Sequence, residues 1–210
     1  MKHVPHLVVG APWRDGPLEL TVIQWRHLTK VLRMSRGDRV TYTDGIGTVG
    51  EGQLADRSIE RGSEEKVDRP TRLTVVVAAP SNKDRQRFLV EKLAEIGVER
   101  LLWLETLQGQ SRLASPSKVF SWVLAATEQS RGAWLMEVSS QPVRLTDLEP
   151  GWVACHPGGD SMTPVTDTVV IGPEGGFADD ELPVDAKLWD LGPTILRVET
   201  AALVAVAKLK

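Results

Sequence analysis

Apolar and polar positions divide the chain into two parts with different periodicity. In the first 70 residues, short apolar runs at 18–23 and 40–42 are separated by turn-forming residues, glycines above all. This pattern predicts short strands joined by turns. Asp44-Gly45 is a typical tight-turn pair, because glycine adopts a positive φ without steric penalty.

One helix is expected within this β-rich part, at about residues 25–34. Three apolar residues recur there at helical spacing and predict a buried face: Leu28, Val31 and Leu32. The stretch that follows at 56–70 is charged and poor in apolar side chains, which indicates a linker or a solvated hairpin end. We therefore expect a domain boundary near Arg69-Pro70.

From residue 73 onward, segments of strand length alternate with amphipathic helical segments. The expected strands are residues 73–78, 101–104, 152–155, 168–171 and 188–191. The expected helices are residues 84–96, closed by Gly97, 116–130, capped by Ser115, and 198–209. Such alternation predicts an α/β domain with a mostly parallel sheet covered by helices. Ligands of these sheets bind beyond the carboxyl ends of the strands.

Composition favours a globular protein of one or two domains, since 41% of the 210 residues are hydrophobic. No apolar run approaches the roughly 18 residues that span a bilayer, and the first residues lack the apolar centre of a signal peptide. The single cysteine, Cys155, has no partner for an internal disulfide. These features predict a soluble cytoplasmic protein.

Charge is distributed unevenly, although the net charge is only −3. Residues 1–39 carry seven Lys/Arg and three Asp/Glu, whereas residues 140–210 carry five and eleven. A basic front is compatible with an RNA-binding face, and equally with an ordinary solvated surface. The candidate phosphate-neutralising residues are spaced by three or four positions: Arg26, Lys30, Arg33, Arg36 and Arg39.

Two glycine-bearing segments near the C-terminus are the candidate chemical site. Residues 170–177 read Val-Ile-Gly-Pro-Glu-Gly-Gly-Phe, and residues 191–202 read Leu-Gly-Pro-Thr-Ile-Leu-Arg-Val-Glu-Thr-Ala-Ala. Glycines at strand ends allow bare backbone to approach a flat ligand. Neither segment has the Gly-Lys-Ser/Thr of a P-loop or the dinucleotide-binding spacing. Each alone is also typical of a structural turn.

Together, and in this order, the two segments resemble the SPOUT class of trefoil-knotted methyltransferases. The closest resemblance is to the family that methylates N3 of a uridine in 16S ribosomal RNA, whose typical motifs match residues 171–177, 191–192 and 195–201. Further similarity covers His27-Leu28, Gly37-Asp38, Lys92 with residues 95–98, Glu128-Gln129-Ser130 and His156-Pro157. The chain departs from the family pattern at residues 106–109, Arg131-Gly132 and Met136, outside the cofactor segments.

The resemblance implies a fold, a cofactor and a partner. Residues 1–70 would form a small β-barrel-like, PUA-like RNA-binding domain, and residues 71–210 a SPOUT domain with a C-terminal trefoil knot. The implied activity is S-adenosylmethionine-dependent methylation of uridine N3 in the small ribosomal subunit, without a metal. The implied cofactor residues are His156, Gly172, Pro173, Glu174, Gly175, Gly176, Leu191, Gly192, Ile195, Leu196, Arg197 and Thr200. A homodimer is expected, with the apolar face of residues 201–209 packed against a second copy.

Uridine N3 carries a proton that must be lost or shared before methylation, so a base and donors to the uracil oxygens are required. Arg131 and Arg197 are candidates to hold these oxygens or the RNA phosphate. Glu128 and Glu199 are candidates to take the proton, and each could instead serve a helix terminus or a salt bridge.

Two alternatives stay open at this point. A related knotted methyltransferase could act on transfer RNA, at a ribose 2′-hydroxyl or at guanine N1. A chain with this fold could also be a non-catalytic RNA-binding assembly factor, a hypothesis that cofactor binding would oppose.

Overall fold

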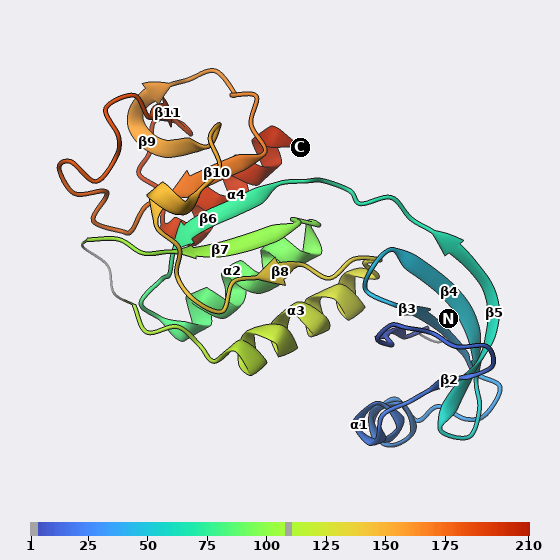
Figure 1. Cartoon of the computed structure of the whole chain (residues 1–210). Coiled ribbons are helices and arrows are strands. Elements are labelled where there is room, and N and C mark those ends of the chain that lie inside the picture. The colour runs from blue at the N-terminus through green and yellow to red at the C-terminus, as the bar shows by residue number, and fades with distance from the viewer. Residues whose placement is uncertain (1–3, 108–110) are drawn as a thin grey trace. The chain divides into compact units, whose positions relative to one another are not determined.

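The computed structural model describes residues 4–107 and 111–210, which form two compact units (Figure 1). The first unit comprises Met1–Arg69 and Leu124–Leu135, and the second comprises Pro70–Val123 and Met136–Lys210. The chain first passes between the units where the sequence indicates a boundary, at Arg69-Pro70. The return of Leu124–Leu135 to the first unit is a feature that the sequence pattern does not predict.

The first unit contains a mixed five-stranded sheet in the order β1-β3-β4-β5-β2. Its strands are β1 (His6–Val8), β2 (Leu18–Glu19), β3 (Arg39–Thr43), β4 (Thr48–Leu54) and β5 (Ser58–Lys66). β1 pairs with β3 in parallel, and the other neighbours are antiparallel. Asp44 closes the β3–β4 hairpin, because its Oδ1 accepts from the backbone N–H groups of Ile46 and Thr48. The predicted tight turn is thus confirmed.

Of the two interpretations of residues 56–70, the solvated hairpin is confirmed and the linker is wrong. β5 lies in the middle of this charged stretch and pairs with β4 in an antiparallel hairpin along most of its length. Backbone pairing to a neighbouring strand stabilises β5, and a search for apolar runs overlooks this contribution.

The core of this unit consists of Leu7, Val9, Leu18, Leu20, Leu28, Met34, Val40, Tyr42, Leu54 and Ile59.

The expected helix begins earlier and is more exposed than predicted. α1 (Val22–Arg26) starts after a capping box formed by Thr21 and Gln24, and continues as a π-helical turn, η1 (His27–Val31). Of the expected apolar face only Leu28 is buried, while Val31 is 65% exposed. Leu28, Val31 and Leu32 do not share one buried face, because the π-turn changes the angular spacing of the side chains around the helix axis.

Hydrogen bonds join the segment Leu124–Leu135 to the β3–β4 turn. Gly47 N–H and the Thr43 hydroxyl both donate to Ala133 O, at 3.0 Å each, and Leu135 N–H donates to Gly45 O at 2.9 Å. A Cβ on Gly47 would stand 2.3 Å from Trp134 Cζ2, so glycine is required for the indole to lie there.

The second unit contains a six-stranded sheet in the order β11-β9-β10-β6-β7-β8, and every neighbouring pair is parallel. The strands are β6 (Thr74–Ala78), β7 (Arg100–Leu104), β8 (Glu137–Val138), β9 (Val153–Asp160), β10 (Thr168–Ile171) and β11 (Lys187–Trp189). The helices are α2 (Lys83–Glu95), the first half of α3 (Pro116–Ser130) and α4 (Val198–Leu209), with a 3-10 turn η2 (Leu145–Asp147). From Leu124 onward, α3 belongs to the first unit. The predicted parallel sheet is confirmed, and α3, β10 and α4 have the expected bounds.

Helices cover only one face of the central strands. α4 packs against α2, β6 and β10. Side chains alternate along a strand, so Val76 and Val170 point to the other face. There they pack with Leu148, Phe177 and other residues of loops, strands and the 3-10 turn η2, and with no residue of an α-helix in the described chain. The expectation that helices cover the sheet therefore holds for one face. Within the described residues, none of the helices has the length and apolar character needed to cross a membrane.

Candidate functional site

A cavity of about 380 Å³ lies at the carboxyl ends of β10 and β11, beside β9. Three stretches of chain form its walls: residues 155–157, residues 171–177 and residues 190–201. This is the position at which parallel sheets of α/β proteins bind their ligands.

The cavity brings together ten of the twelve residues expected to bind a cofactor. These are His156, Gly172, Pro173, Glu174, Gly175, Gly176, Leu191, Gly192, Ile195 and Leu196. The other two, Arg197 and Thr200, are exposed at the start of α4 and do not line it. Six further lining residues belong to the motifs but are not among the expected cofactor residues: Pro157, Ile171, Phe177, Thr194, Val198 and Ala201. The sequence motifs missed Cys155 and Asp190, which also line the cavity.

The glycines of the cavity serve two different purposes. A Cβ on Gly172 would stand 2.8 Å from Cε2 of Phe177, so the missing side chain accommodates that ring. At Gly192, with φ +143°, nothing stands within 4 Å of the Cβ position. Gly176, which also lines the cavity, has the same open space at its Cβ position. Gly176 and Gly192 therefore fit the expectation that a bare backbone leaves room for a ligand, and Gly172 does not.

Asp190 ties two walls of the cavity together. Its carboxylate accepts from Gly192 N–H at 2.9 Å and from Gly158 N–H at 3.3 Å. These backbone hydrogen bonds, that from Gly192 first, hold the pKa of Asp190 below its ordinary value. Lys208 of α4 fixes the same turn from the other side, since its Nζ donates to Leu191 O at 3.0 Å.

The polar groups of the cavity suit a ligand that carries a positive charge. Glu174 and Asp190 contribute carboxylates, whereas no lysine or arginine occurs among the described lining residues. The His156 Nδ1 atom is buried and has no hydrogen-bond partner within the described structure, which leaves it free for a ligand. Burial raises the pKa of the Cys155 thiol to about 12, so this thiol stays protonated.

Arg85 of α2 contacts two carboxylates at the edge of the cavity. Its Nη1 lies 3.7 Å from Glu174 Oε1, and its Nε lies 3.7 Å from Glu199 Oε1. Glu199, a candidate base, is buried, and Arg85 is its salt-bridge partner. The other oxygen of this carboxylate, Oε2, has no hydrogen-bond partner in the described chain. No local signal marks Arg85, because α2 is far from both carboxylates in the sequence.

The other two catalytic candidates belong to the first unit and do not line this cavity. Glu128 Oε1 accepts from Val8 N–H at 3.1 Å, and burial raises the pKa of Glu128. Arg131 has φ +58° and donates from Nη2 to Val4 O at 2.7 Å. Ten of the twelve cofactor candidates therefore meet in one cavity, whereas none of the four catalytic candidates is among its described lining residues.

The basic residues of the first unit differ in their ion pairing. Arg39 lies 2.7 Å from Glu51 and Arg36 lies 3.9 Å from Glu60. The other three are exposed and form no ion pair within residues 4–107 and 111–210: Arg26, Lys30 and Arg33. Unpaired exposed cations are the groups most available to phosphates.

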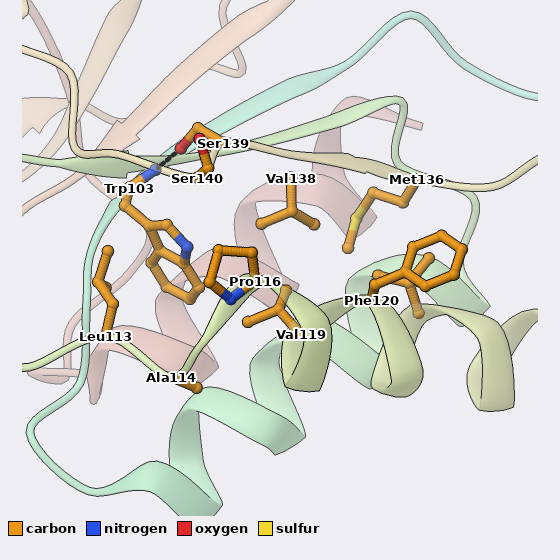
Figure 2. A pocket seen from close by; sticks show the side chains of 11 residues that line it. Trp103, Leu113, Ala114, Pro116, Val119, Phe120, Met136, Val138, Ser139 and Ser140 are labelled. Carbon is orange, nitrogen blue, oxygen red and sulfur yellow. Dashed lines mark hydrogen bonds between the residues drawn. The ribbon is translucent and has the colours of Figure 1, made fainter.

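A second, smaller cavity of about 80 Å³ lies between β7, β8 and α3. Figure 2 shows its apolar wall, including Trp103, Pro116 and Met136, with Ser139 accepting from the Trp103 backbone N–H at 2.9 Å. No titratable side chain occurs among its described lining residues, so it offers little chemistry. The described residues also contain no cluster of His, Cys, Asp or Glu that could hold a metal ion.

Comparison with known proteins connects this geometry to a family. Ribosomal RNA small subunit methyltransferase E of Synechocystis is 28% identical over 227 residues, covering 93% of this chain and 73% of that protein. The Rickettsia conorii protein of the same name is 25% identical, covering 85% of this chain and 80% of its own. A Legionella pneumophila structure described as a methyltransferase with bound S-adenosylmethionine superposes with a TM-score of 0.82 at 25% identity, covering 99% and 97%.

The sequence model of the RNA methyltransferase domain matches residues 67–210, which include all three walls of the cavity. The match covers more than half of the chain and begins close to the start of the second unit. This chain therefore belongs to the RNA methyltransferase domain family.

Proposed function

We propose that this protein transfers a methyl group from S-adenosylmethionine to N3 of a uridine in 16S ribosomal RNA. The observation that carries the proposal is the three-walled cavity at the carboxyl ends of β10 and β11, in which both glycine segments meet. The relatives named as small subunit methyltransferases and the cofactor-bound Legionella structure support the substrate and the cofactor. The trefoil knot and the PUA-like character of the first unit belong to the same proposal.

The cavity fits the cofactor in polarity as well as in position. Its apolar residues Leu191, Ile195 and Leu196 would pack on the adenine ring. Its carboxylates would attract the cationic sulfonium, and the free Nδ1 of His156 would receive or donate one hydrogen bond. When bound, the cofactor supplies an electrophilic methyl group.

The residues of the chain must then bind the uracil and relieve N3 of its proton. Arg197, exposed between the lining residues Leu196 and Val198, is our candidate donor to the uracil oxygens. Glu199 is the favoured proton acceptor, because its buried Oε2 has no partner in the described chain. Glu128 is less favoured, since its Oε1 already accepts a backbone hydrogen bond.

The proposed partners are the small ribosomal subunit and a second copy of the chain, in the cytoplasm. The apolar face of α4 does not need that copy, because Ala202, Ala205 and Val206 are already buried within one chain. Ile195, at 81% exposure on the cavity rim, is the residue that a second copy would cover. Light scattering that gives a single-chain mass at micromolar concentration would contradict the homodimer.

The deciding experiment uses small subunits from a strain that lacks the gene. The purified protein is incubated with these subunits and S-adenosylmethionine carrying a labelled methyl group, and digested RNA is analysed by mass spectrometry. We expect label in 3-methyluridine. Label in a 2′-O-methylated nucleoside or in 1-methylguanosine would assign a different activity, and no label with bound cofactor would favour an assembly factor. Transfer RNA serves as the control substrate.

A further inference from the structure

Arg85 joins three elements that are distant in the sequence. It lies near the start of α2, Glu174 lies in the loop after β10, and Glu199 lies in the first turn of α4. Its guanidinium uses two different nitrogens, one for each carboxylate, at 3.7 Å. The Arg85 and Glu174 side chains are 35% and 44% exposed, whereas that of Glu199 is only 11% exposed.

We propose that Arg85 is a positioning residue of the cofactor cavity, which holds the β10 loop against the start of α4. The inference rests on the proposed function, because it takes S-adenosylmethionine as the ligand. Glu174 lines the cavity directly, and Val198 and Ala201 on either side of Glu199 line it too. A shift of Arg85 would therefore move two walls at once. An isolated surface ion pair contributes little, but a cation shared by two carboxylates constrains both.

Positioning and simple charge compensation predict opposite results for this cavity. S-adenosylmethionine carries a positive sulfonium, and its product S-adenosylhomocysteine has lost that charge. If Arg85 acted only through its charge, removing it would leave Glu174 and Glu199 uncompensated and would tighten the cationic cofactor while leaving the product unchanged. If Arg85 positions the walls, its removal weakens both ligands, because both need the same cavity shape.

Calorimetric titration of the full chain with the two ligands separates these outcomes. We expect Arg85→Gln and Arg85→Ala to weaken both ligands by about tenfold, a typical loss for a disturbed site. Arg85→Lys should restore the affinity only in part, since one ammonium nitrogen replaces two guanidinium nitrogens that face different carboxylates. Arg87→Ala is the matched control, because Arg87 lies on the same helix and pairs with Glu91 at 2.7 Å on the surface.

Each outcome supports or overturns the inference. Unchanged affinities in Arg85→Gln, tighter cofactor with unchanged product, or full recovery in Arg85→Lys would each overturn the positioning role. Should the Arg85 variants melt at much lower temperature than Arg87→Ala, Glu174→Gln provides the second test. This substitution breaks one of the two ion pairs of Arg85 at a half-exposed site. If Glu174→Gln binds both ligands with wild-type affinity, the inference is also overturned. A wild-type chain that binds neither ligand would defeat the proposed function itself, a result distinct from all of these.

Discussion

The ring of Phe177 lies against the backbone of Gly172, so closely that a Cβ at Gly172 would stand 2.8 Å from the ring. Phe177 also packs against the buried cluster formed by Val76, Leu104, Ala154 and Val170. The first glycine of the β10 loop therefore connects the cavity wall to the core. The missing side chain of Gly172 makes room for the Phe177 ring.

Gly172→Ala should lower the free energy of unfolding by about 1–3 kcal/mol, because the added methyl overpacks the Phe177 ring. Displacement of the loop should weaken S-adenosylmethionine binding in parallel. Phe177→Leu in the same chain should restore part of both losses by making room. Gly10→Ala, where nothing stands within 4 Å of the Cβ position, is the control. Chemical denaturation and calorimetry measure the two quantities, and a stable Gly172→Ala chain would contradict the packing role.

Glu128→Gln should leave the fold intact and stabilise it near neutral pH. Burial raises the pKa of Glu128, so its charged form disfavours the folded state above that pKa. Glutamine keeps an oxygen to accept the Val8 N–H and carries no charge. The gain in unfolding free energy should disappear as the pH falls below the ordinary carboxyl pKa. Exposed Glu137 provides the control, as Glu137→Gln. A loss of methyl transfer of about 10² or more would instead identify Glu128 as the base.

The stability of the first unit should fall on mild acidification because of His6. Its Nδ1 lies 2.9 Å from Thr41 Oγ1 and its Nε2 3.2 Å from Gly132 O, and burial lowers its pKa below 6.5. The unfolded chain therefore binds the proton first as pH falls. The stabilisation is fully present above pH 6.5 and decreases down to the lowered pKa. In His6→Gln, the denaturant midpoints measured at pH 7.5 and 5.5 should converge. In the control variant His27→Gln they should stay apart. An equal pH effect in both variants would exclude His6 as the cause of the loss of stability.

Replacing Arg26, Lys30 and Arg33 together by alanine should weaken RNA binding and reduce its salt dependence. Each lost phosphate contact lowers the magnitude of the salt slope by about 0.7–0.9. Cofactor affinity should be unchanged, because none of the three lines the cavity. The pair Arg36 and Arg39, which already contact Glu60 and Glu51, should have a smaller effect when replaced. If the triple variant methylates small subunits at the wild-type rate across a salt series, these three residues do not contribute to RNA binding.

The sequence is informative where local pattern and tertiary packing agree. The second unit follows its apolar pattern closely, and residues 116–130, 168–171 and 198–209 form the expected elements with those bounds. The glycine segments identify the cavity because both follow strands of the parallel sheet, whose carboxyl ends must meet at one edge.

The sequence is uninformative where partners are distant. β5 looks like a linker because its exposed charges hide a strand that exists through pairing with β4. No local sequence signal marks Arg85, because its two carboxylate partners approach it only in the folded chain. The contact of Glu128 with Val8 also has no local signal, because the two residues are 120 positions apart in the sequence.

The return of Leu124–Leu135 to the first unit constrains the order in which the nascent chain can fold. The β3–β4 turn needs Ala133 as acceptor and Trp134 as cover, yet these residues are synthesised only after β6, α2, β7 and α3. A ribosome that has made the first 70 residues has therefore not delivered a complete first unit. Gene fusions or truncations cut at Arg69-Pro70 would yield a fragment with an uncovered turn, because the first unit is complete only when residues 124–135 are present.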